Sequence, residues 1–258
     1  MTNRIQQLFS NKNSKVLSIY FTAGYPSLND TETIIKSLSN AGVDFIEIGI
    51  PFSDPVADGP TIQRSSEIAL ENGMTMKLLF EQIQNIRQHT QIPLLLMGYI
   101  NPVLRYGIDA FCAKCEEIGI DGVILPDLPM QEYIEEYKAT FEKHNLVNVF
   151  LITPVSSEER VRWIDENSNG FIYMVATAGT TGQRTDVSNE QEAYFQRIKS
   201  YNLKNPIVAG FGISDKNTFD KATEIANGAI IGSAFVKALG EEGELEEKIS
   251  QFVKNIIL

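Results

Sequence analysis

The chain has 258 residues, of which 43% are hydrophobic, and 22 basic against 33 acidic residues leave a formal net charge of −11. This balance argues against nucleic-acid binding, because there is no basic surplus to neutralise phosphates. No apolar run approaches the roughly 18 residues of a membrane span. The first residues, Met1 to Gln6, lack the apolar core of a signal peptide, so a cytoplasmic protein is predicted.

Short apolar segments alternate along the chain with longer amphipathic ones, a pattern typical of parallel α/β folds. The predicted strands cover residues 16–21, 45–49, 94–98, 122–125, 147–152, 171–175, 206–210 and 229–231. The predicted helices cover residues 30–40, 61–71 with 76–89, 108–118, 131–144, 157–166, 190–199, 216–225 and 242–257.

Eight strand–helix repeats without a long linker predict a closed (β/α)8 barrel, a TIM barrel, with residues 1–258 as a single domain. Such barrels run to about 250 residues as one domain. An open doubly wound sheet is the competing architecture, and it usually carries G-x-G-x-x-G after its first strand. Here the first strand runs into Thr22-Ala23-Gly24-Tyr25-Pro26, which does not match that motif.

Two carboxylates of opposite character follow one another around the end of the second strand. Glu47 lies among apolar residues of the strand, where burial disfavours ionisation and raises the pKa towards neutrality. Asp58 lies in the following loop, just before Gly59-Pro60 and a helix start, where we expect it to stay charged. Two carboxylates separated in pKa are typical of a general acid/base pair. The alternative is that Asp58 only caps the helix and Glu47 belongs to a buried ion pair.

The ends of the last three strands are rich in small residues. They lead into Ala178-Gly179-Thr180-Thr181-Gly182, Ala209-Gly210-Phe211-Gly212-Ile213-Ser214 and Ile231-Gly232-Ser233-Ala234. Glycines let backbone N–H groups approach an anion, and Ser233 begins a short helical segment whose dipole favours negative charge. Phosphate sites after strands seven and eight recur in this fold. The pattern predicts a phosphate-carrying substrate, with glycines that serve only as turns as the alternative.

A C-x-x-C motif, Cys112 and Cys115, falls in a predicted helix. Without a second pair or a nearby histidine it does not indicate a zinc site. Both cysteines are therefore predicted to pack as small buried residues.

The segment Glu47-Ile48-Gly49-Ile50-Pro51-Phe52-Ser53-Asp54-Pro55-Val56-Ala57-Asp58-Gly59-Pro60-Thr61-Ile62-Gln63 resembles the signature of the tryptophan synthase α chain family. Further matches are Asn101-Pro102-Val103, Pro126-Asp127-Leu128-Pro129 and Gly210-Phe211-Gly212-Ile213-Ser214. The resemblance runs from about Phe9 to the C-terminus. It implies cleavage of indole-3-glycerol phosphate to indole and glyceraldehyde 3-phosphate, without metal or organic cofactor in this chain. It also implies an α2β2 complex with a β chain that carries pyridoxal phosphate and consumes the indole.

The resemblance assigns roles to individual residues. The family's catalytic glutamate and aspartate fall on Glu47 and Asp58, and its substrate-site tyrosine falls on Tyr173. Its phosphate-binding positions fall on Gly182, Gly212, Gly232 and Ser233. One departure is Met174-Val175-Ala176-Thr177-Ala178, where many relatives carry a Ser-Arg pair, so the role of that arginine is open at Thr177.

Apolar and aromatic residues near the strand ends are expected to wall the flat indole ring, as ligand pockets are mostly apolar. These residues are Met97, Tyr99, Phe211 and Ile230, and simple packing is the alternative role for each.

The loop between the two carboxylates predicts a docking site for the β chain. Asp54 has no evident internal role, and Pro51 and Pro55 limit its freedom. A solvated loop acid is the alternative. Thr181 is expected to close over the same mouth and to bind Asp58 or its neighbours.

Three other functions stay open from the residues alone: another phosphosugar barrel enzyme such as an epimerase, a stand-alone indole-releasing lyase, and a non-catalytic regulatory subunit. The presence of both Glu47 and Asp58 argues against the last of these, because a pure regulator needs neither.

Overall fold

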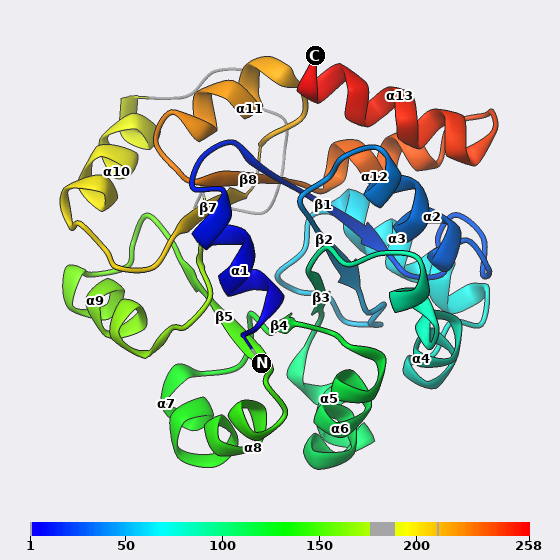
Figure 1. Cartoon of the computed structure of the whole chain (residues 1–258), viewed down its shortest axis with the longest axis horizontal. Helices are drawn as coiled ribbons and strands as arrows, with labels where there is room; N and C mark the ends of the chain where they lie inside the picture. The colour runs from blue at the N-terminus through cyan, green and yellow to red at the C-terminus, as the bar shows by residue number, and fades with distance from the viewer. Residues whose placement is uncertain (1, 176–188, 211) are drawn as a thin grey trace.

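The computed structural model describes residues 2–175, 189–210 and 212–258. Eight parallel strands form a closed barrel in which each strand pairs with the next and β8 returns to β1 (Figure 1). The strands are β1 (Val16–Thr22), β2 (Phe45–Gly49), β3 (Leu94–Met97), β4 (Gly122–Ile124), β5 (Val147–Ile152), β6 (Ile172–Val175), β7 (Ile207–Gly210) and β8 (Gly228–Ile231). This confirms the predicted barrel.

Helices surround the barrel, and α1 lies over one of its ends (Figure 1). They are α1 (Arg4–Asn11), α2 (Thr31–Asn40), α3 (Pro60–Glu71), α4 (Met76–Ile83), α5 (Ile100–Tyr106), α6 (Ile108–Ile118), α7 (Met130–Glu132), α8 (Lys138–Lys143), α9 (Glu158–Asn167), α10 (Asn189–Ser200), α11 (Lys216–Thr223), α12 (Ser233–Leu239) and α13 (Leu245–Ile257). A 3₁₀ turn, η1 (Ile86–Gln88), follows α4, and a π-helical turn, η2 (Tyr133–Tyr137), joins α7 to α8.

The predicted strands are confirmed, and their ends differ from the observed ones by at most one residue. The predicted helices are also confirmed, with ends that differ by at most three residues, except that the helix predicted over residues 76–89 ends at Ile83 and is followed by the separate turn η1. Helices α1 and α5 were not predicted. Cys112 and Cys115 lie on the buried side of α6, which confirms their predicted packing. None of the described helices is long and apolar enough to cross a membrane.

Alternate residues of each strand face opposite sides of the barrel wall, as the period of two requires. On β1, Val16 and Tyr20 belong to the cluster inside the barrel. Leu17, Ile19 and Phe21 belong to the larger cluster between the strands and the helices. Because both faces of each strand are buried, the strands read as continuous apolar runs in the sequence.

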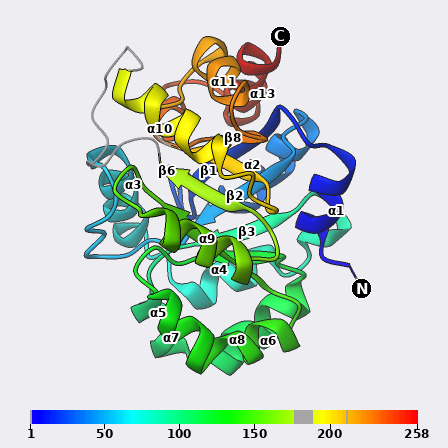
Figure 2. The same ribbon diagram turned by 90° about the vertical axis from the view of Figure 1, so that its left-hand side faces the viewer.

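Helix α1 closes the N-terminal end of the barrel, opposite the strand ends that carry the candidate site (Figure 2). Ile5 is buried, and the ring of Phe9 lies 5.8 Å from that of Phe171 inside the barrel. Arg4 Nη1 lies 2.9 Å from the buried Oδ1 of Asp121, which ties the helix to the residues before β4. The end of the barrel away from the site is therefore sealed by side chains.

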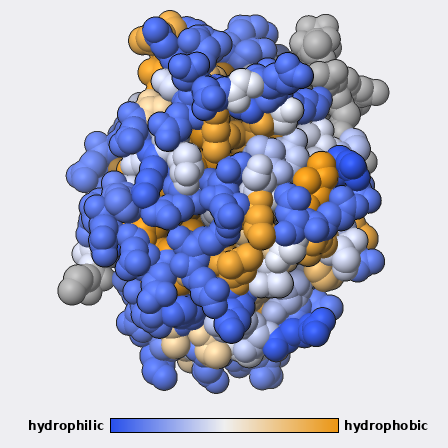
Figure 3. Space-filling model, turned by 90° about the vertical axis from the view of Figure 1, so that its right-hand side faces the viewer, coloured by the Kyte–Doolittle hydropathy of each residue, from blue (hydrophilic) through white to orange (hydrophobic). Residues whose placement is uncertain are grey.

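The outer surface agrees with the acidic, hydrophilic composition. The side of the molecule in Figure 3 presents mostly hydrophilic residues, with hydrophobic residues in small separate patches. Most hydrophobic side chains instead fill the two clusters on either side of the barrel wall.

Candidate active site

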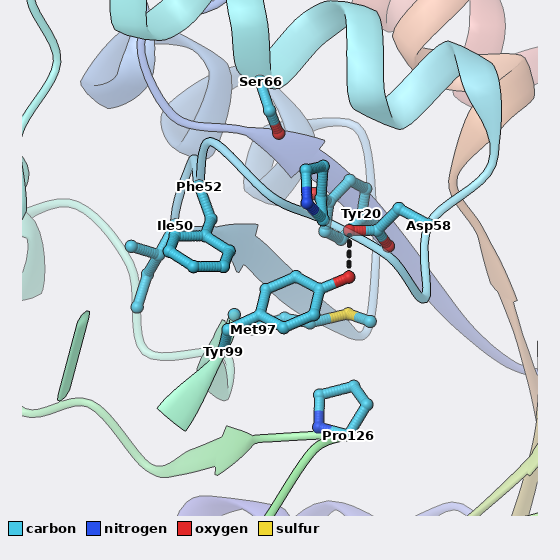
Figure 4. Close-up of a pocket in the computed structure, with 10 residues that line it drawn as sticks. Tyr20, Ile50, Phe52, Asp58, Ser66, Met97, Tyr99 and Pro126 are labelled. Carbon is cyan, nitrogen blue, oxygen red and sulfur yellow. Dashed lines mark hydrogen bonds between the residues drawn. The ribbon is translucent and has the colours of Figure 1, made fainter. Parts of the chain in front are cut away.

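A pocket lies at the C-terminal ends of the first three strands, where catalytic residues of this fold are found. Its lining comes from β1, the loop after β2, helix α3, the end of β3 and the segment after β4 (Figure 4). The residues that matter for the chemistry are Tyr20, Phe52, Asp58, Met97 and Tyr99. The pocket is thus mostly aromatic and apolar, with a single carboxylate among the residues that line it.

Glu47 lies on β2, inside the barrel, in register with Tyr20 on β1 and Leu95 on β3. It is 0% exposed, and within the described residues neither carboxylate oxygen has a hydrogen-bond partner. Burial raises the pKa of Glu47 to about 8, in the predicted direction. A buried ion pair for Glu47, the alternative from the sequence, finds no partner in the part of the chain that is described.

Asp58 is held by a hydrogen bond from Tyr99, which follows the end of β3. The Tyr99 hydroxyl donates to Asp58 Oδ2 at 3.0 Å (Figure 4). The same hydroxyl accepts from the Ala57 N–H at 3.0 Å. The helix that follows has Gly59 at its N-cap, and no side chain caps it. The interpretation of Asp58 as only a helix cap is therefore wrong.

The environment of Asp58 also differs from the expected polar loop. Burial raises the pKa of Asp58 to about 6, and the hydrogen bond from Tyr99 opposes this rise. The expected polar surroundings are not found, because the side chain of Asp58 lines the pocket, but a pKa of about 6 still leaves the carboxylate charged near neutral pH, as expected. At neutral pH Asp58 is still mostly ionised while Glu47, with a pKa of about 8, is mostly protonated. The two carboxyls are therefore separated in the order that an acid/base pair needs.

Two tyrosines that point into the barrel have their hydroxyl groups next to glycines of the neighbouring strands. A Cβ atom at Gly49, at the end of β2, would clash with the Tyr20 hydroxyl. In the same way, a Cβ atom at Gly210, at the end of β7, would clash with the Tyr173 hydroxyl. These glycines leave room for the tyrosines of the strands before them. Tyr20 was missed in the sequence, because its position beside the site depends on the register between β1 and β2.

Three of the other residues expected to contact the substrate lie inside the barrel or in the pocket, and the fourth is outside the described residues. Tyr173 is buried on β6, and burial, with the carboxyls of Glu47 and Asp58, raises its pKa well above the usual value. Met97 lines the pocket beside Tyr99 (Figure 4). Ile230 is buried on β8 in the same interior cluster as Tyr173. Phe211, expected to contact the ring, lies outside the described residues.

The expected phosphate positions follow β7 and β8. Gly212 has a positive φ of 76°, a conformation that side-chain-bearing residues rarely adopt. Gly232 is the N-cap residue of α12, and Ser233 begins that helix as predicted. Backbone N–H groups at a helix start are suited to an anion. Gly182 and Thr181 lie outside the described residues.

The expected docking loop is exposed at its tip and buried at its base. Asp54 is exposed, and its Oδ2 accepts a hydrogen bond of 2.5 Å from the hydroxyl of its neighbour Ser53. Pro51 is buried, and Val56 is 81% exposed. An exposed acid and an exposed valine therefore lie together beside the mouth of the barrel.

Comparison with known proteins decides the family. The model of the family described as "Tryptophan synthase alpha chain" matches residues 6–257. The chain belongs to the tryptophan synthase alpha chain family. It is 61% identical over 254 residues to the tryptophan synthase alpha chain of Flavobacterium johnsoniae, with 98% of this chain and 99% of the relative covered. It is 54% identical over 257 residues to that of Phocaeicola vulgatus, with 98% and 100% covered.

Solved structures of the family agree in fold. The tryptophan synthase alpha chain of Legionella pneumophila superposes with a TM-score of 0.88 at 31% identity, covering 99% of this chain and 96% of that one. A chain of the Mycobacterium tuberculosis tryptophan synthase gives a TM-score of 0.88 at 32% identity, covering 99% and 97%. The resemblance read from the signature around Glu47 and Asp58 is thus confirmed at the level of the family, and the chain has the role of an alpha subunit.

Proposed function

We propose that this chain cleaves indole-3-glycerol phosphate to indole and glyceraldehyde 3-phosphate, a carbon–carbon lyase reaction. The observation that carries the proposal is a pair of carboxyls, Glu47 inside the barrel and Asp58 in the pocket at its mouth. Glu47 is buried and mostly protonated at neutral pH, and Asp58 is mostly ionised and held by Tyr99. Membership of the alpha chain family supports the choice of substrate.

Glu47 supplies and removes the protons. The bond between indole C3 and the glyceryl carbon breaks only when indole leaves as a neutral molecule. Glu47 protonates C3, which gives an indolenine, and the carbon–carbon bonding pair returns to the ring as the bond breaks. The Glu47 carboxylate then takes the proton of the adjacent glyceryl hydroxyl, whose oxygen becomes the aldehyde carbonyl. A group that gives and takes protons works best with a pKa near the working pH, as the pKa of about 8 provides.

Asp58 stabilises the charge that this proton transfer creates. Its carboxylate accepts a hydrogen bond from the indole N–H and balances the positive charge developing on the ring. Tyr99 holds Asp58 in place through its hydroxyl. The ring lies against Met97, Tyr173, Ile230 and Phe211, and the phosphate lies at Gly182, Gly212, Gly232 and Ser233.

The reaction uses side-chain acid/base steps, so we propose that it requires no metal or organic cofactor in this chain. We propose a tryptophan synthase β chain as partner in an α2β2 complex, with pyridoxal phosphate only in the β chain. Asp54 and Pro51 lie at this interface, and Thr181 closes over the mouth when the β chain docks. The cytoplasmic location expected from the sequence belongs to the same proposal.

An assay of indole release tests the proposal. The isolated chain is expected to release indole slowly from indole-3-glycerol phosphate, and faster when a β chain is added. No release under either condition would overturn the reaction. Full speed alone and no response to a cognate β chain would instead indicate a stand-alone lyase, which the names of the relatives do not favour.

A further inference from the structure

A chain of buried hydroxyl groups leads from the active site into helix α3. The Tyr20 hydroxyl lies 3.4 Å from Thr22 Oγ1, and Thr22 Oγ1 lies 2.6 Å from Ser65 Oγ. Ser65 Oγ in turn donates to the backbone carbonyl of Ile62 at 2.9 Å. Thr22 is 0% and Ser65 1% exposed, so water does not compete for these groups.

The carbonyl at the end of this chain fixes the direction of every proton in it. A carbonyl oxygen only accepts, so the single hydroxyl proton of Ser65 is directed to Ile62. Thr22 must then donate to Ser65, because the short contact between them needs one proton. With its own proton used, Thr22 accepts from Tyr20. The Tyr20 proton therefore points along β1, and the lone pairs of its oxygen are left for the cavity.

The oxygen so oriented lies among the ionisable groups of the site. Tyr20 is the register partner of Glu47, and its hydroxyl lies against Gly49, two residues further along β2. Burial, and then the Asp58 carboxyl, raise the pKa of Tyr20, so it stays a neutral hydroxyl. Six ionisable groups interact at this end of the barrel among the described residues. They are Tyr20 on β1, Glu47 on β2, Asp58 and Tyr99 in the loops, Asp127 after β4, which acts on Tyr99, and Tyr173 on β6.

We propose that Thr22 and Ser65 are positioning residues that hold the Tyr20 proton away from Glu47 and so keep the Glu47 carboxyl protonated for proton donation. The inference rests on the proposed role of Glu47 as the proton donor. A hydroxyl that turns its proton towards a carboxyl stabilises the carboxylate, whereas one that turns its lone pairs towards it favours the neutral acid. The buried chain selects the second orientation.

The experiment is a double-mutant cycle on the full chain. Thr22→Val removes the acceptor of the Tyr20 proton with little change of shape. The protonation midpoint of Glu47 is followed by NMR of protein labelled with δ-13C glutamate, and Glu47→Gln assigns the signal. Thr22→Val is expected to lower this midpoint by about half a pH unit or more, because the released proton of Tyr20 then favours the carboxylate. In a Tyr20→Phe background, the same substitution is expected to leave the midpoint where Tyr20→Phe alone puts it.

Two outcomes would overturn the inference: an unchanged midpoint in Thr22→Val, or an equal shift in the wild-type and Tyr20→Phe backgrounds. If Thr22→Val does not fold, Ser65→Ala makes the same test, because Thr22 then loses its acceptor and no longer requires the Tyr20 proton. The matched control is Thr223→Val on α11, another buried threonine, which donates to the Phe219 carbonyl. It is expected to change unfolding only and to leave the Glu47 midpoint unchanged.

The same variants separate this inference from the proposed reaction. If the wild-type chain releases no indole but the NMR cycle gives the expected pattern, the reaction is wrong and the orientation of Tyr20 stands. If indole is released and the mutant cycle shows no dependence on Tyr20, the positioning role is wrong and the proposed reaction stands. If both the reaction and the positioning role hold, the alkaline limb of the pH profile for indole release is expected to lie at lower pH in Thr22→Val than in the wild type.

Discussion

The Tyr99 hydroxyl donates a hydrogen bond of 3.0 Å to Asp58 Oδ2 and thereby joins the end of β3 to the loop after β2. This bond acts on the charged form of Asp58, so it opposes the rise in pKa that burial causes. Because the same hydroxyl accepts from the Ala57 N–H, it also holds the backbone next to Asp58. One tyrosine thus controls both the position and the charge of the carboxylate.

The first prediction follows from this bond. In Tyr99→Phe the pKa of Asp58 rises above its value of about 6, since burial is no longer opposed. The ionised fraction at neutral pH falls, so the acidic limb of the pH profile for indole release moves to higher pH. Tyr106→Phe, on α5, is the control and keeps the wild-type profile. An acidic limb that stays in place in Tyr99→Phe would contradict the role given to the bond.

A second prediction concerns the close contact of Tyr20 with Gly49. Gly49→Ala places a methyl group against the Tyr20 hydroxyl and is expected to destabilise the fold by about 1–3 kcal/mol, as overpacking does. Tyr20→Phe removes the nearest atom and is expected to recover part of that loss. Tyr173→Phe serves as the control, because Tyr173 lies across Gly210 instead. The measurement is urea unfolding, and equal recovery by both phenylalanines would refute the pairing.

The third prediction locates the substrate phosphate. Ser233→Asp sets a carboxylate at the start of α12, against the phosphate, and repulsion of about 1–4 kcal/mol corresponds to a rise in KM of about fivefold or more. Ser10→Asp adds the same charge on α1 at the opposite end of the barrel and is expected to leave KM unchanged. Steady-state kinetics of indole release decide the matter. An unchanged KM in Ser233→Asp would mean that the substrate phosphate does not bind at the start of α12.

The fourth prediction tests the docking loop. Asp54→Ala removes an exposed acid whose side-chain hydrogen bond is to its neighbour Ser53. It is expected to weaken activation by the β chain more than it weakens the rate of the isolated chain. Glu224→Ala, an exposed acid after α11, is the comparison and leaves activation intact. Rates with increasing β chain measure the effect, and activation that survives in Asp54→Ala would return this residue to the role of a solvated acid.

The strands were predictable from the sequence because burial on both faces makes them continuous apolar runs. Helix α1 was not, because its sequence, RIQQLFSN, is short and mostly polar, and only Ile5 of it is buried. Apart from the Asn3 side chain, which caps the helix by accepting from the Ile5 N–H, the contacts that hold α1 are tertiary: Phe9 packs against Phe171, and Arg4 is bound to Asp121. The local pattern of apolar and polar residues does not predict such tertiary contacts.

The candidate site divides in the same way. Glu47 was recognisable because a carboxylate interrupts an apolar strand, and the direction of its pKa follows from burial alone. The environment of Asp58 was misjudged because the loop folds back to meet Tyr99, 41 residues further along the chain. Tyr20 was missed because its place beside Glu47 follows from the register of β1 with β2. The residue types in the sequence indicated the chemistry, whereas the contacts of those residues depended on the fold.

The central claim is that Glu47 transfers the proton that breaks the carbon–carbon bond. The direct measurement is the rate of indole release by Glu47→Gln, with calorimetric titration of indole-3-glycerol phosphate to measure binding by the same variant. Glutamine keeps the shape of the side chain and cannot exchange the proton, so the rate is expected to fall by about 10²–10⁴-fold or more while binding stays close to wild type. A variant that binds substrate and keeps more than about a tenth of the wild-type rate would contradict the account, because a loss of proton transfer costs far more than that.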